Sequence, residues 1–248
     1  MVQLEICIDS VAGAIAAEQG GADRLEICGN LVEGGTTPSM GMICAVLEVT
    51  SLPVMVMIRP RGGPFCFTKD EKNVMRRDAQ LVLEQPIAGI VMGAAGEDGS
   101  IDEAFCEEIR RLSMGRSMTF HRAFDQLKEP VESLEKLVRL GVDRLLTSGQ
   151  APTAMEGVEL IRQLVDISAD RIVVMPGGGV RAENIADLVA ECEVTEVHGT
   201  ASDWASPFQG FWRDDVPMCA ASGPLDLVRR VTADHQVRAM KTALVEMA

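Results

Sequence analysis

The sequence has no long apolar run, no excess of basic residues and no secretory signal. No stretch approaches the roughly eighteen apolar residues that a membrane-spanning helix needs, so we expect no membrane partner. The formal net charge is −14, from 37 acidic and 23 basic residues, which argues against nucleic acid as a general partner. Any site for an anion must therefore be local. Because the first residues lack a basic segment followed by an apolar one, we expect a cytoplasmic protein.

Several catalytic motifs are also missing. Neither His-x-His nor His-Glu-x-x-His occurs, which disfavours a metal-dependent hydrolase. The lysines all fall in predicted helices or loops, which disfavours a Schiff-base aldolase. The first predicted strand is followed by Asp9 and Ser10 rather than by a glycine-rich turn, so no nucleotide or other organic cofactor is predicted. The seven cysteines form no Cys-x-x-Cys pair, which fits reduced thiols better than a disulfide framework.

What is present is a regular alternation of strand and helix patterns. Short apolar runs rich in β-branched residues predict eight strands, over residues 2–8, 23–28, 53–59, 87–93, 116–121, 142–147, 171–175 and 194–198. Segments of helical periodicity include residues 38–50, 70–84, 102–112, 131–140, 183–190 and 225–246. This alternation predicts an α/β fold, a single-domain TIM (β/α)8 barrel over residues 1–248, with an open doubly wound sheet as the main alternative.

Residues 199–223 form the longest predicted loop, between the last strand and the C-terminal helix. This loop carries Trp204, Phe208, Phe211 and Trp212. These aromatic side chains indicate either a lid or a dimer contact, or more simply a loop that packs its own side chains.

The tetrapeptide Leu-Glu-Ile-Cys occurs twice, ending once at Cys7 and once at Cys28, and each copy lies in a predicted strand. Alternate side chains of a strand share a face, so Glu5 points the same way as Cys7, and Glu26 the same way as Cys28. If the two strands are parallel neighbours, two carboxylates and two thiols meet on the inner wall of the barrel.

The same alternation places further polar residues inside the barrel. Arg59 ends the third predicted strand and Arg61 follows it, His121 ends the fifth, and His198 ends the eighth. Each histidine then has an inward carboxylate that would tune it as a general acid or base. The alternative is structural, because Glu5 and Glu26 would also neutralise Arg59 and Arg61 as buried ion pairs.

Two groups of residues indicate a site for an anion. Gly177, Gly178 and Gly179 follow the seventh strand, where many barrels bind phosphate through backbone N–H groups, although three glycines also simply make a tight turn. Arg59 and Arg61 add bidentate donors.

The thiols indicate a possible metal site. Cys7 and Cys28 would suit Cu(I), which favours sulfur ligands. The alternative is that both cysteines are ordinary buried residues, because free cysteine often fills space in a protein core.

Eight segments together resemble the CutC family, which is named for copper homeostasis. They are residues 4–7 with 9–10, 21–28, 33–39, 58–63, 119–125, 146–149, 175–180 and 196–198. The resemblance implies a TIM barrel in the cytoplasm, a homo-oligomer, and copper bound by Cys7 and Cys28. The segments that carry it also contain two further candidates, Asp125 for catalysis and Ser148 for anion binding.

Two hypotheses follow. The first is a CutC-type copper homeostasis protein that binds Cu(I) through thiols. The second is a barrel enzyme that performs acid/base chemistry on a small anionic or phosphorylated, sugar-like metabolite. In the second, Glu5, Glu26 and His121 would move protons while Arg59 and Arg61 hold the anion.

Overall fold

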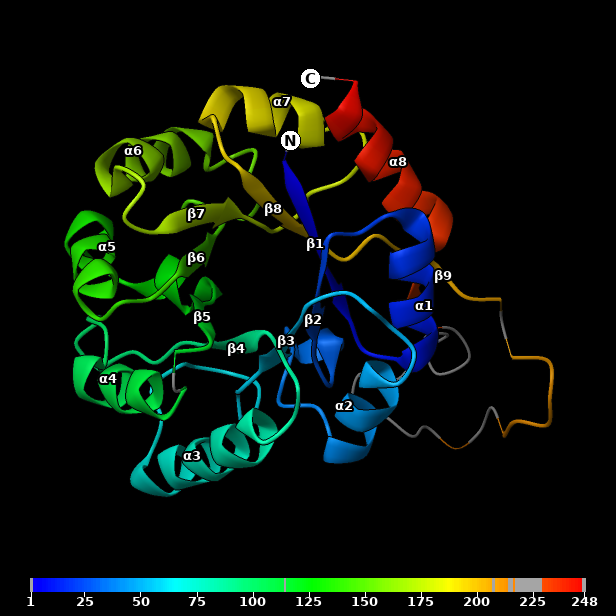
Figure 1. Cartoon of the computed structure of the whole chain (residues 1–248), viewed down its shortest axis with the longest axis horizontal. Helices are drawn as coiled ribbons and strands as arrows, with labels where there is room; N and C mark the ends of the chain where they lie inside the picture. Colours follow the sequence, from blue (N-terminus) through cyan, green and yellow to red (C-terminus); the bar gives the residue numbers. More distant parts are fainter. Residues whose placement is uncertain (1, 114, 207, 214–215, 217–228, 247–248) are drawn as a thin grey trace.

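A computed structural model describes residues 2–113, 115–206, 208–213, 216 and 229–246. Strand and helix alternate eight times along these residues, and the strands form a ring enclosed by the helices (Figure 1). The strands of the ring are β1 (Gln3–Ile8), β2 (Arg24–Ile27), β3 (Val54–Met57), β4 (Gly89–Met92), β5 (Ser117–Phe120), β6 (Arg144–Thr147), β7 (Val173–Pro176) and β8 (Glu196–Gly199). The prediction of a TIM barrel is confirmed.

The strands pair in parallel, in the order β7-β6-β5-β4-β3-β2-β1-β8. Strands β7 and β8, at the two ends of this order, lie side by side and bring the ring close to closure (Figure 1). The register pairs Glu5 with Arg24 and Cys7 with Glu26, so the two Leu-Glu-Ile-Cys strands are parallel neighbours as predicted.

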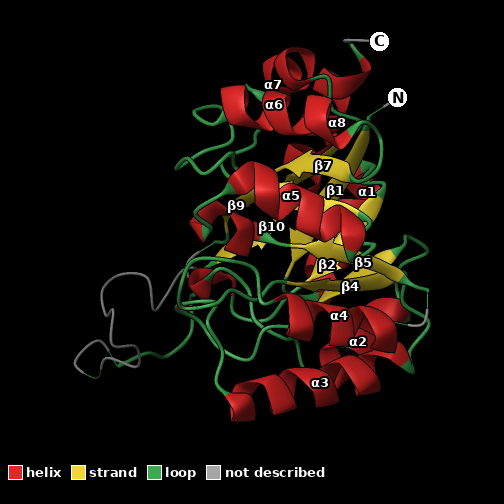
Figure 2. Cartoon of the chain, turned by 90° about the vertical axis from the view of Figure 1, so that its left-hand side faces the viewer, coloured by secondary structure: helices red, strands yellow, loops and turns green. Residues whose placement is uncertain are grey.

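Eight α-helices cover the outside of the strands among the described residues (Figure 2). They are α1 (Val11–Gly20), α2 (Met40–Leu47), α3 (Lys69–Leu83), α4 (Glu103–Leu112), α5 (Pro130–Arg139), α6 (Val158–Ser168), α7 (Ile185–Cys192) and α8 (Asp234–Val245). Local signals set their ends. For example, Thr68 and Glu71 form a reciprocal capping box at the start of α3. No helix in the described ranges is long and apolar enough to cross a membrane.

The predicted C-terminal helix begins later than the sequence pattern indicates. Helix α8 starts at Asp234, because Arg230–Thr232 (β10) pairs antiparallel with Ser202–Trp204 (β9). The prediction of a helix from residue 225 is therefore wrong for residues 230–232, while residues 225–228 lie outside the described ones. Residues 207, 214–215 and 217–223 of the predicted loop, Cys219 among them, also lie outside the described residues. The four aromatic side chains in the described part of that loop are exposed.

Two apolar clusters stabilise the barrel. The larger lies between strands and helices and contains outward-facing residues such as Leu4, Ile6 and Ile8, all fully buried. The smaller lies inside the barrel and consists of Cys7, Cys28, Met55, Met57 and Val91. Sulfur-bearing side chains therefore occupy much of the interior below the carboxyl ends of β1, β2 and β3.

A network of buried charges lies deeper in the barrel. Nε of Arg24 donates to Glu5 at 2.5 Å, and Nη2 of Arg24 donates to Glu196 at 2.5 Å. Glu196 also accepts from Nε of Arg144 at 2.7 Å. The structural alternative considered above would pair Glu5 with Arg59 or Arg61, but its arginine partner is Arg24. The neighbouring strand already presents Arg24 to Glu5 in register, whereas Arg59 lies beyond the end of β3.

Candidate metal centre at the carboxyl end of the barrel

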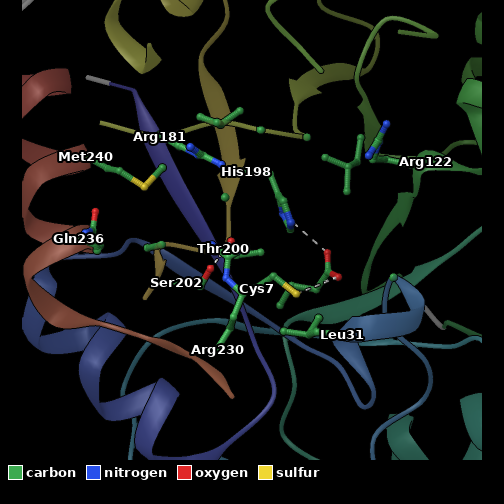
Figure 3. A pocket seen from close by; sticks show the side chains of 18 of the residues that line it. Cys7, Leu31, Arg122, Arg181, His198, Thr200, Ser202, Arg230, Gln236 and Met240 are labelled. Carbon is green, nitrogen blue, oxygen red and sulfur yellow. Dashed lines mark hydrogen bonds and ion pairs between the residues drawn. The ribbon is translucent and has the colours of Figure 1, made fainter. Parts of the chain in front are cut away.

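A cavity of about 1040 Å³ opens at the carboxyl ends of the strands, where TIM barrels place their functional sites. Figure 3 shows Cys7 and His198 directed into the cavity from neighbouring strands. Its deep part is lined by Cys7, Glu26 and His198, and its outer part by the turns after β7 and β8.

The two thiols and one carboxylate meet at the floor of this cavity. Sγ of Cys7 lies 3.5 Å from Sγ of Cys28, and Sγ of Cys28 lies 3.0 Å from Oε1 of Glu26. Ligand atoms of Cys7, Glu26 and His198 all lie within 4.8 Å of one another. Cys7 lines the cavity, whereas Cys28 is almost fully buried beside it and does not.

A second carboxylate orients the histidine of this cluster. Nδ1 of His198 lies 2.8 Å from Oε1 of Glu5, and Glu5 is in turn fixed by Arg24. Burial opposes charge on Glu5, but the hydrogen bond with His198 and the positive charge of Arg24 outweigh it and lower the pKa of Glu5 to about 2. Burial likewise opposes charge on His198, but its hydrogen bond with Cys7 and the nearby carboxylates raise the pKa of His198 well above its usual value.

The surroundings of Cys28 and Glu26 oppose a negative charge on either group. Hydrogen bonding with Cys7, burial and the charge of Glu26 raise the pKa of the Cys28 thiol well above its usual value. Burial also raises the pKa of Glu26. Oε2 of Glu26 is buried and accepts no hydrogen bond within the described ranges. A bound cation would satisfy this oxygen, and binding by the thiols would release their protons.

His121 lies on the cavity wall but not in the thiol cluster. Its Nδ1 accepts from the backbone N–H of Ala123 at 3.1 Å, and its ring packs against Phe65. Burial and the nearby charge of Arg59 lower the pKa of His121 to about 3. The predicted pairing of His121 with an inward carboxylate is not formed, because Glu5 and Glu26 face His198 instead.

The two arginines predicted to bind an anion have other partners. Nη1 of Arg59 donates to the carbonyl oxygens of Glu33 and Gly35, and Nη2 donates to that of Gly63. Arg59 lines the cavity, but these bonds hold the loop that follows β2. Arg61 lies away from the cavity, where it pairs with Glu71 on α3.

Three further predicted residues stand behind the cavity wall rather than on it. Asp125 and Ser148 contact Arg122, and the N–H of Gly177 donates to the carbonyl of Thr147 at 2.9 Å. Gly178 and Gly179 do line the cavity. Asp125 accepts from several donors and has a side chain only 5% exposed, so the structure places it under Arg122, with no contact to the cavity.

Sequence reasoning missed two arginines that matter for this region. Arg24 alternates with Glu26 along β2, so the same rule that placed Glu26 inside the barrel also applies to Arg24. Arg122 follows His121 directly and begins a short 3-10 helix (Arg122–Gln126), which turns its side chain along the cavity rim. No periodicity in the sequence indicates that turn.

Fold and site together define a class: a TIM barrel with two thiols, a carboxylate and an imidazole gathered at the carboxyl end of its first, second and eighth strands. Such a set of soft and borderline donors suits a soft or borderline metal ion. The sequence profile of the CutC family matches residues 2–203, and the chain belongs to the CutC family.

Individual relatives agree with this assignment. The chain is 41% identical over 237 residues to the human copper homeostasis protein cutC homolog, covering 96% of this chain and 87% of the human protein. It is 43% identical to a CutC family protein of Agrobacterium fabrum, covering 97% of this chain and 93% of that protein. A crystal structure of CutC from Streptococcus agalactiae superposes with a TM-score of 0.76 at 33% identity, covering 81% of this chain and 99% of that one.

Proposed function

We propose that this protein acts in copper homeostasis by binding Cu(I) at the floor of the barrel cavity through Cys7 and Cys28. One observation carries the proposal: the two sulfur atoms lie 3.5 Å apart beside a buried carboxylate. Thiolates favour Cu(I) over harder ions. The name of the human relative points to the same metal.

The residues around the thiols fit this role. Because Nδ1 of His198 is engaged by Glu5, Nε2 is the ring nitrogen left for an ion, and binding there would release its proton. A carboxylate behind a histidine fixes the ring and its tautomer, an arrangement common among metal-binding histidines. Glu26 supplies a buried oxygen with a free lone pair. Arg24, which holds Glu5, supports the site from below.

The proposal is tested by a competitive titration of the reduced protein. We expect the protein to take one Cu(I) per chain from a chromophoric chelator. The dissociation constant of the protein for Cu(I) should lie below the nanomolar range. A parallel titration with Zn(II) is essential, because two thiols with a carboxylate and a histidine also resemble zinc sites. We expect Zn(II) to bind far more weakly and to leave Cu(I) binding unaffected at equal concentration. Failure to take Cu(I) from the chelator, or a preference for Zn(II), contradicts the proposal.

We also infer a cytoplasmic homo-oligomer. Cu(I) ligation by free thiols needs a reducing compartment. All six cysteines in the described ranges are free. The oligomer is inferred from the family resemblance and is checked by light scattering coupled to size-exclusion chromatography.

A further inference from the structure

The outer part of the cavity carries positive charge that the copper proposal does not use. Four arginines line the cavity, namely Arg59, Arg122, Arg181 and Arg230. Of the acidic residues that the structure describes, two line it, Glu26 at the floor and Glu183 at the rim. Because the whole chain has a formal net charge of −14, this local excess of arginine stands against the general charge of the molecule.

One of these arginines is held in place from behind. Nε of Arg122 donates to Asp125 at 2.8 Å, and Nη2 donates to Oγ of Ser148 at 2.6 Å. Asp125 is fixed by donors from the turn after β6, including the hydroxyl of Thr147 at 2.5 Å and the N–H of Gln150 at 3.2 Å. This support leaves Nη1 of Arg122 without a hydrogen bond among the described residues. A planar guanidinium that is fixed on two nitrogens is ready to donate from the third.

A glycine turn faces that free nitrogen. Gly178 and Gly179 have φ of 106° and 73°, a left-handed conformation that favours glycine. A Cβ at Gly178 would lie 3.1 Å from Nη1 of Arg122, so a side chain there would fill the space in front of the guanidinium. Within the described ranges, the N–H groups of Gly178, Gly179 and Val180 donate to no other residue. The turn beside Arg122 thus has three backbone N–H groups with no acceptor among the described residues.

The turn after β8 adds to the same rim. Thr200 lines the cavity, and its hydroxyl oxygen lies 3.3 Å from that of Ser202. Asn184, which precedes α7, also lines the cavity. Turns after the seventh and eighth strands are where barrels commonly bind phosphate.

We propose that Arg122 and the Gly178–Gly179 turn form a binding site for the phosphate group of a small phosphorylated molecule. The number of donors favours phosphate over carboxylate, because three phosphate oxygens can accept from all of them. A cavity of about 1040 Å³ has room for a molecule much larger than phosphate itself. The body of that molecule would lie over Cys7 and His198 at the floor. This site does not depend on copper being bound.

Calorimetric titration of the reduced, metal-free protein tests this site. The probes are inorganic phosphate and glycerol 3-phosphate, with succinate as a dicarboxylate and sodium chloride at matched ionic strength. We expect saturable binding of both phosphates, with glycerol 3-phosphate the tighter. The Arg122→Met variant should weaken binding about tenfold or more, since it loses a charged hydrogen bond. The Arg122→Lys variant keeps the positive charge but loses the planar guanidinium. Its phosphate affinity should lie between those of the wild type and Arg122→Met.

The matched control is Arg139→Met, which makes the same charge change at an exposed position on the outer helix α5. It should leave phosphate affinity unchanged, and circular dichroism verifies the fold of each variant. Absence of saturable phosphate binding by the wild type overturns the proposal, as does equal binding by wild type and Arg122→Met. Equal affinity for succinate assigns the site to carboxylates instead and also overturns it. Cu(I) affinity measured on Arg122→Met separates the two sites, because it should remain at the wild-type value.

Discussion

Replacement of Arg24 by methionine should lower the free energy of unfolding by about 3–5 kcal/mol. Arg24 is 5% exposed and neutralises two carboxylates that are themselves buried, Glu5 and Glu196. Methionine fills much of the same volume, so the loss comes from two buried carboxylates that each lose a positively charged partner rather than from a cavity. Chemical denaturation followed by circular dichroism measures the effect.

Two controls separate this effect from the loss of an ordinary ion pair. Arg171→Met breaks an exposed pair with Glu135 and should cost at most about 1 kcal/mol. Adding Glu5→Gln to Arg24→Met neutralises the carboxylate that has lost its only arginine partner and should recover part of the stability. If Arg24→Met costs no more than Arg171→Met, the buried network does not stabilise the barrel.

The pH dependence of the free energy of unfolding also tests the buried pair of Glu5 and Arg24. Glu5 has a folded-state pKa of about 2, below its ordinary value of 4.5. Its contribution is therefore complete above pH 4.5 and is lost as the pH falls toward 2. The Arg24→Met variant should lose much of this acid-induced decline, because one cause of the lowered pKa is gone.

The Cys7→Ser, Cys28→Ser double variant should lose Cu(I) affinity by about a hundredfold or more. Serine offers a harder oxygen that is not deprotonated near neutral pH, so both soft ligands disappear while the size of the side chain hardly changes. The competitive titration described for the wild type measures the loss.

The matched control for the double variant is Cys44→Ser, an exposed cysteine on α2 far from the cavity lining. It should bind Cu(I) as the wild type does. Circular dichroism shows whether the double variant still folds, which is expected because Cys7 and Cys28 belong to a small interior cluster only. Unchanged affinity in a folded double variant would show that the thiols are not the ligands.

Much of the fold and part of the site could be predicted from two regularities of the sequence, the recurrence of strand and helix patterns and the alternation of side chains along each strand. The recurrence of strand and helix patterns predicts the barrel, and the alternation along β1 and β2 places Glu5, Cys7, Glu26 and Cys28 on its inner wall. His198 follows from the same rule on β8. These residues meet because their strands are adjacent and parallel, which the barrel topology requires.

The prediction that Arg59 and Arg61 bind an anion inside the barrel extended the alternation of side chains beyond the end of the third strand. Strand β3 ends at Met57, and beyond a strand end the alternation of faces no longer applies. The partners of Arg59 are backbone carbonyls at Glu33, Gly35 and Gly63, and sequence carries no signal for such contacts. The sequence likewise gives no signal for the role of Arg122 in the proposed phosphate site, because that role depends on how the turns after β5, β6 and β7 pack together. The strand β10 was missed for a similar reason: it forms only by pairing with β9, which is distant in sequence.

The most direct test of copper binding through thiols is X-ray absorption at the copper edge on wild-type protein carrying one Cu(I) per chain. We predict two sulfur neighbours around the copper, from Cys7 and Cys28, and loss of both in the double serine variant. A copper environment made only of nitrogen and oxygen neighbours in the wild type would contradict the account.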